Sequence, residues 1–264
     1  IVEAPSPTSI AEKMAYAKET TVNIFEANGH SPFIRGSVFG GSEDGHILNN
    51  THVNIMAGQV GGADLDNLTA DGNSLHGNVY GGGRGWDQYY DEEGKLRYCL
   101  TSGHVYGNTY VTISGGKICR NVYGGGNMSS VGRYEILLDG EGNPILDENG
   151  NTQYALADNG DPIPVVGTGL AEINISGGVI GNQNDEGRMH GNVFGSSRGM
   201  AGAEFKELGC THNTDVKING DAVIIKGSVF GGGEDGHVNQ NTKVTVNGGT
   251  IGVTEGDPFK GNVY

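Results

Sequence analysis

A five-residue phrase recurs along the whole chain: glycine, any residue, valine, an aromatic residue, glycine. Such a repeat restricts the fold more than any other sequence feature, because every copy has to adopt the same local structure. It also weakens a functional role for any repeated residue, since a catalytic site is needed once and a scaffold position in every repeat. The copies occupy residues 36–40, 77–81, 120–124 (with Arg120 in place of the first glycine), 191–195, 227–231 and, incompletely, 261–264.

A second phrase, Thr-x-Val-x-Ile with some variation, precedes each copy of the first. It occupies residues 21–24 (shortened), 51–55, 109–113, 171–175, 214–218 and 242–246. Its apolar residues alternate with a period of two, which predicts short strands, and no apolar stretch is long enough for a helix. Four copies follow an asparagine, and these four are predicted to form a ladder of side chains at a turn: Asn50, Asn108, Asn213 and Asn241.

Three short strands per repeat, with glycine or asparagine at each bend, predict an all-β fold. We expect a right-handed parallel β-helix, or β-solenoid, of about six coils, in which each side chain stacks on its copy about 4.8 Å away. The valines and isoleucines would form inward ladders. The glycines, 49 of 264 residues, would supply the positive φ angles of the bends.

Repeat lengths differ, since Thr51 and Thr109 are 58 residues apart and Thr214 and Thr242 only 28. The extra residues fall at two corners, where a solenoid tolerates them. Five insertions are predicted, at residues 63–75, 86–100, 128–164, 182–189 and 199–209. The longest is predicted to be a projecting β-meander, and residues 88–98 to be a second hairpin.

Residues 21–264 are thus assigned to the repeats and residues 1–20 to an N-terminal cap. Within that segment, Ser9 and Glu12 match a capping box and predict a short helix that covers the first coil.

The composition excludes some partners. A net charge of −15 argues against nucleic acid, because phosphate binding needs a basic surface, and no apolar run approaches the ~20 residues of a membrane span. A cation or a neutral glycan fits this charge better. The pairing of Cys99, Cys119 and Cys210 cannot be derived from spacing, and three free thiols are the favoured interpretation.

Two identical tetrapeptides carry the first candidate site residues. Glu43 and Asp44 precede a histidine by two or three positions, and so do Glu234 and Asp235. Such a set can bind a metal or move a proton. Because the two sets occupy equivalent repeat positions, the favoured interpretation is a solvated polar corner.

A calcium site is the second candidate. Residues 61–68 resemble one copy of a calcium-binding nonapeptide, with Asp64 and Asp66 as ligands, but Asp64 stands where that motif has its third glycine. That motif binds calcium between stacked copies, whereas this chain contains a single copy. We therefore expect no cofactor, with calcium as the alternative.

Aromatic residues offer a surface for sugars. The ring of each repeated phrase either forms an outward platform for glycans or stacks on its copies beneath the corner loops, and the stacked packing is favoured. The unrepeated Trp86, beside Tyr89 and Tyr90, is the preferred recognition residue.

Two arginines, Arg84 and Arg198, follow the glycine-rich corners and are expected on one face with Glu43 and Glu234. A polysaccharide lyase or glycoside hydrolase on a β-helix would need a cluster of acids, or of acids with Arg or Lys, that occurs once on one sheet face. The charges at the four positions named above occur in more than one repeat. An enzyme is therefore the alternative and not the favoured class.

The two phrases together resemble the glycine-rich repeats of large surface proteins of gut bacteria, over about residues 21–264. The resemblance implies an exported, bacterial, multi-repeat β-solenoid without catalytic residues to transfer. We therefore expect a non-catalytic extracellular scaffold, either an adhesin-like stalk or a module that binds a glycan or a host or bacterial surface. Its oligomeric state is not predicted. A spacer within a fibre, assembled through its coil ends, is a third hypothesis.

Overall fold

The computed structural model describes residues 15–62, 76–85, 88–90, 92–146, 153–182, 190–202, 205–252 and 260–264. In this part of the chain the protein is all-β, as expected, and most strands pair in parallel. The described residues contain no α-helix, and thus none long and apolar enough to cross a membrane.

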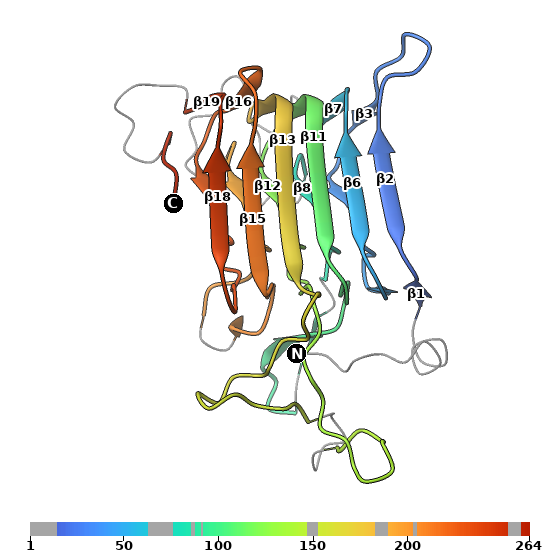
Figure 1. The fold of residues 1–264 in the computed structure, drawn as a ribbon. Helices are drawn as coiled ribbons and strands as arrows, with labels where there is room; N and C mark the ends of the chain where they lie inside the picture. The colour runs from blue at the N-terminus through green and yellow to red at the C-terminus, as the bar shows by residue number, and fades with distance from the viewer. Residues whose placement is uncertain are drawn as a thin grey trace.

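The copies of the Thr-x-Val-x-Ile phrase form neighbouring strands of one ten-stranded sheet (Figure 1). Its main path consists of β2 (Thr20–Ile24), β6 (Thr51–Ile55), β11 (Thr109–Ile118), β13 (Leu170–Ile180), β15 (Asn213–Ile218) and β18 (Thr242–Val246). Four short strands extend the same sheet: β3 (Phe33–Ile34), β7 (Gln59–Val60), β16 (Val223–Ile225) and β19 (Thr250–Ile251). All these strands pair in parallel, so each repeat returns the chain in the same direction.

The valine and aromatic residue of the other phrase form a second, five-stranded parallel sheet. Its strands are β4 (Val38–Phe39), β8 (Val79–Tyr80), β12 (Val122–Tyr123), β14 (Val193–Phe194) and β17 (Val229–Phe230). Two small pairs complete the strands: β1 (Tyr16–Ala17) with β5 (His46–Ile47), and the antiparallel hairpin of β9 (Gln88–Tyr90) and β10 (Leu96–Tyr98).

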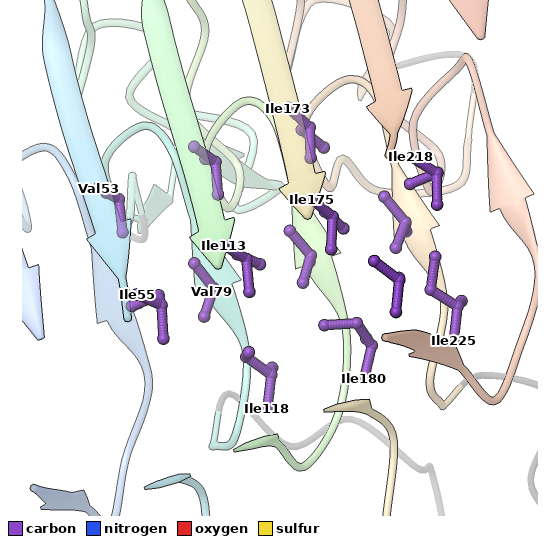
Figure 2. Close-up of a cluster of buried hydrophobic side chains, with 14 of the residues drawn as sticks. Val53, Ile55, Val79, Ile113, Ile118, Ile173, Ile175, Ile180, Ile218 and Ile225 are labelled. Atoms are coloured by element: carbon purple, nitrogen blue, oxygen red, sulfur yellow. The ribbon is translucent and has the colours of Figure 1, made fainter. Parts of the chain in front are cut away.

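The core consists of apolar rows that run across the sheets. Ile55, Ile113, Ile175 and Ile218 lie opposite one another in successive strands, and each is at most 1% exposed (Figure 2). Burial of one such side chain contributes roughly 1.5–3 kcal/mol. The predicted inward ladders are confirmed, and their cumulative burial accounts for a core built from strands of only two to eleven residues.

Threonine and glycine connect the two repeated phrases within each repeat. The hydroxyl of Thr109 donates to the carbonyl oxygen of Gly124 at 2.6 Å, and that of Thr214 to Gly231 at 2.6 Å. A Cβ atom on Gly124 would lie 2.1 Å from the carbonyl oxygen of Gly195 in the next repeat. Its φ angle is not positive, so the second glycine of the phrase is required by this close approach and not by a bend, which corrects the expectation.

Asparagine side chains satisfy backbone groups between repeats, as predicted for the first ladder. The Oδ1 atom of Asn50 accepts from the N–H of Asn108, and that of Asn108 from the N–H of Leu170, both at 2.9 Å. A second ladder was not predicted: Asn78 and Asn121, within the aromatic phrase, accept from the next repeat in the same way. Each asparagine therefore fixes the stacking of two repeats.

The predicted N-terminal helix lies mostly in residues 1–14, outside the described part. Where the chain is described, Tyr16 and Ala17 form strand β1 instead, so that end of the expected helix is wrong. β1 pairs in parallel with β5, and Ala17 packs against Ile47, Val105 and Val131. Pairing with β5 gives the backbone N–H and C=O groups of β1 hydrogen-bond partners. A capping box would satisfy only N–H groups at the start of a helix.

Candidate functional site

Three insertions share an apolar cluster outside the main core. Met128 and Leu208 are each 2% exposed and form its centre. Around them pack Leu96, Leu100, Met200 and Phe205. These residues come from the insertions at 86–100, 128–164 and 199–209, which are therefore one packed body and not three independent loops.

The longest insertion forms the expected hairpins. Antiparallel bridges join Leu138 to Pro144 and Leu156 to Pro162. The Asp139 carboxylate accepts hydrogen bonds from the backbone N–H groups of Asn143 and Glu141, both at 2.9 Å, and these bonds lower its pKa. The carboxylate thus closes the turn between Leu138 and Pro144.

A cleft of about 530 Å³ lies where this insertion meets the one at 199–209. The meander contributes Tyr154, Leu156 and Asp161 to its wall, and the other insertion contributes Lys206 and Glu207. Tyr134, Gln153, His237 and Asn239 also line it. Clefts of this size that combine aromatic and convergent polar side chains are typical ligand sites.

The aromatic side of the cleft is supported from below. The ring of Tyr134 is 5% exposed and lies 4.8 Å from the His212 ring, while Tyr154 meets it edge-on at 6.0 Å. Burial raises the pKa of Tyr134, against a hydrogen bond with Asn239, so the phenol stays neutral. Tyr154 is half-buried and Leu156 is 59% exposed, so these two present the apolar surface to a ligand.

Neither the histidine beneath the Tyr134 ring nor the cysteine in the cleft wall is ionised near neutral pH. Burial lowers the pKa of His212 to about 4, and the neutral ring lies with Nδ1 3.1 Å from the Thr168 carbonyl oxygen, to which it donates. Burial likewise raises the pKa of the Cys210 thiol to about 11, so it is not a thiolate near neutral pH. Cys99, Cys119 and Cys210 are all free thiols, which confirms the favoured interpretation.

The charged groups of the cleft are few. Lys206 provides one positive charge, and Asp161 and Glu207 provide two negative ones. The whole chain carries −15. An anionic ligand is therefore disfavoured, and a neutral or weakly cationic one fits better.

The structure brings together the two arginines and two glutamates of the sequence prediction. Arg84 contacts the carboxylate of Glu43, and Arg198 Nε lies 3.8 Å from Glu234 Oε1. Asn127 connects the pairs, since it accepts from Arg198 at 3.1 Å and donates to the Arg84 carbonyl oxygen at 3.2 Å.

Only one of these pairs is open to solvent. The side chains of Arg198 and Glu234 are 12% and 13% exposed, against 33% and 62% for Arg84 and Glu43. The hydroxyl of Tyr123 donates to the Glu234 carboxylate, and burial, reinforced by that carboxylate, raises the pKa of Tyr123. Burial lowers the pKa of Arg198, but the two tyrosines, Tyr80 and Tyr123, and Glu234 outweigh it, so the net shift is upward.

The candidate metal ligands Glu43, Asp44, Glu234 and Asp235 do not converge. Asp44 accepts a hydrogen bond from the Ser102 hydroxyl at 2.9 Å, and Asp235 is exposed with a φ of 55°. Among the residues the structure describes, no three His, Cys, Asp or Glu side chains form a metal-binding group. Asp64 and Asp66 lie outside these residues.

The aromatic row, formed by the ring of each repeated phrase, is a stack and not a platform. Neighbouring rings from Phe39 to Tyr264 have centroids 4.7–5.1 Å apart and are nearly parallel. Tyr80 and Tyr123 are at most 1% exposed. This confirms the stacked packing, and the rings of the middle repeats cannot reach a ligand.

The hairpin of β9 and β10 does present aromatic residues. Tyr89 is 54% exposed and Tyr90 is 73% exposed, on adjacent positions of one strand. Trp86 lies outside the described residues.

Comparison with known proteins adds no relative. No family model, no curated protein and no solved structure matches this chain. The function therefore has to be argued from the cleft and the repeats themselves. Sequence reasoning identified the insertions that form the cleft and the tetrapeptide that contains His237. It missed Tyr134 and Tyr154, although both are unrepeated aromatic residues within the longest insertion.

Proposed function

We propose that the chain is a right-handed parallel β-helix of about six coils that serves as a non-catalytic binding scaffold. In-register parallel ladders in two sheets, repeated from β2 to β18, support this architecture, and parallel crossovers are almost always right-handed. The repeats' resemblance to surface proteins of gut bacteria supports an extracellular or cell-surface location. An electron-density map of the crystallised chain tests both the coil and its hand.

The ligand we propose is a neutral glycan, bound in the cleft between the two insertions. The carrying observation is that Tyr154 and Leu156 offer an apolar wall while Gln153, Lys206 and Glu207 offer hydrogen-bonding groups. Sugar rings have an apolar face and a polar rim, which this combination matches. The insertions would then be adhesive elements held by a rigid stalk.

A glycan array tests the proposal with the wild type and four variants. Tyr154→Ala should weaken binding about tenfold, whereas Tyr154→Phe, which keeps the ring, should bind nearly as the wild type does. Trp86→Ala and Tyr90→Ala report whether the hairpin takes part. Absence of binding to every neutral glycan, or equal binding by Tyr154→Ala, contradicts the cleft.

A glycoside hydrolase is the second candidate, because two carboxylates, Asp161 and Glu207, line the same cleft. Glycosidases use such a pair as acid and base or nucleophile. Reducing-end release from any glycan that binds, lost in Glu207→Gln, would replace the binding function by catalysis. Binding without product release supports the scaffold.

A further inference from the structure

Most exposed large apolar side chains of the described chain lie in four places, and Val166, just after the longest insertion, is the exception. Two of the places are the insertions at 86–100 and 128–164. The other two are the opposite edges of the ten-stranded sheet and its neighbours. Near β2 these residues are Tyr16, Phe25, Phe33 and Met56, and near β18 they are Ile224, Val246, Val263 and Tyr264.

The two edges present the same rows. The row that begins with Val22 in β2 continues through Val53, Val111, Ile173 and Val216 to Val244 in β18. The adjoining rows run from Ile24 to Val246, from Ile34 to Ile251 and from Phe39 to Tyr264. Each row therefore begins and ends with a residue of the same chemical type.

From this match we propose that β18 of one molecule pairs in parallel with β2 of a second copy, so that molecules stack head to tail. The second copy would place valine on Val244, isoleucine on Val246 and Phe39 on the ring of Tyr264, which is 66% exposed. The hydrogen-bonding groups of both strand edges would be satisfied, as they are between successive repeats. Such an interface does not close on itself and produces linear assemblies.

Charge supports this register. The solvent-facing row that begins with Thr21 ends with Lys243, and the one that begins with Asn23 ends with Thr245. At the proposed junction no like charges face each other, because Lys243 meets Thr21 and Thr245 meets Asn23. In the stack, Lys243 would lie over Thr21 of the next molecule, so position 21 becomes a sensitive reporter.

Sedimentation velocity of the 264-residue chain over a concentration series tests the stack. The wild type should form species that lengthen with concentration. Thr21→Lys, which opposes Lys243, should weaken association about two- to fivefold, and Thr21→Glu should strengthen it by a similar factor. Non-specific association predicts the reverse order, because lysine lowers the net negative charge and glutamate raises it.

Thr112 provides the matched control. It is an exposed threonine of β11, which is flanked by strands on both sides, so Thr112→Lys and Thr112→Glu change the net charge without touching an edge. Neither should alter association by more than the bulk charge effect. Equal responses at positions 21 and 112 would overturn the proposal.

A disulfide trap tests the register. In a Cys99→Ser background, Thr21→Cys combined with Lys243→Cys should give covalent multimers without reductant, because strand neighbours lie within disulfide reach. The combination of Thr21→Cys with Thr245→Cys is out of row and should give none. A chain that stays monomeric up to its solubility limit, or traps equally in both variants, contradicts head-to-tail stacking.

Discussion

The tetrapeptide Glu-Asp-Gly-His occurs at residues 43–46 and 234–237, in two different environments. In the first copy the glutamate is 62% exposed and the histidine is 1% exposed. In the second copy Glu234 is 13% exposed, while His237 is exposed and lines the cleft. The same four residues thus exchange which side chain is buried.

The cause lies in the neighbouring segments. His46 is in β5, which pairs with β1, and its N–H donates to the Ala15 carbonyl oxygen at 3.0 Å. Glu234 instead meets Arg198 and the Tyr123 hydroxyl, both contributed by other repeats. Equivalence in a repeated sequence therefore fixes the backbone path, whereas the role of a side chain depends on what the adjacent repeats and insertions place over it.

Acid should produce the largest effect, through the buried histidines. Burial lowers the pKa of His46, of His104 to about 3 and of His212 to about 4, so the unfolded chain binds more protons below about pH 6.5. The free energy of unfolding should be constant above that pH. It should fall by about 2 kcal/mol for each of His104 and His212 by pH 5.

Urea unfolding at pH 7.5 and pH 5 measures this. His104→Gln, which can still donate to the Gly132 carbonyl oxygen, should reduce the fall, and His237→Gln should leave it unchanged. An identical pH dependence of the unfolding free energy in both variants would show that the buried His104 does not cause the loss of stability in acid.

The buried glutamate should matter more than the exposed one. Glu234→Ala leaves Arg198 buried without its carboxylate and should cost about 3 kcal/mol of unfolding free energy. Glu43→Ala removes a solvent-screened contact and should cost less than about 1 kcal/mol. Chemical denaturation of both variants at pH 7.5 compares them. Equal losses would mean that the burial of Glu234 is not energetically important.

The Tyr123 hydroxyl should account for part of the Glu234 effect. Tyr123→Phe keeps the ring in its stack between Tyr80 and Phe194 and removes the hydroxyl, which donates to Glu234 and accepts from Asn121, at a cost of about 1.5 kcal/mol. In a double-mutant cycle with Glu234→Ala the two losses should not add. Strict additivity would contradict a direct contact.

The exposed histidine should affect stability least. His237→Ala should change the free energy of unfolding by less than about 0.5 kcal/mol, since His237 is an exposed side chain. If the cleft binds glycans, the same variant should weaken binding severalfold. Wild-type affinity on a glycan array would remove His237 from the site.

The strands were predictable because their signal is local and repeated. A period of two over five residues indicated β6, β11 and β15 and placed Val53 and Ile55 in the core. The placement of Arg84 and Arg198 on one face with Glu43 and Glu234 also followed from their equal positions after the glycine-rich corners, whereas their pairing did not. These features need no information beyond the repeat itself.

The cleft was not predictable in the same way. Tyr154 and Glu207 meet because two insertions of different length pack on Met128 and Leu208. No period relates the insertions, and such contacts depend on tertiary packing. The burial of Glu234 escaped prediction for a similar reason, since its partners come from residues 36 and 111 positions earlier in the chain.

The shared cluster around Met128 and Leu208 also has a mechanical consequence. A pull on opposite edges of the long sheet would peel repeats one at a time, releasing 28 residues between Asn219 and Asn247 and 62 between Asn108 and Leu170. Because Leu96, Met128 and Leu208 belong to one cluster, the repeats that carry them would yield together at a higher force. The insertions would thus act as a clamp that protects the middle of the molecule under tension, while its ends extend first.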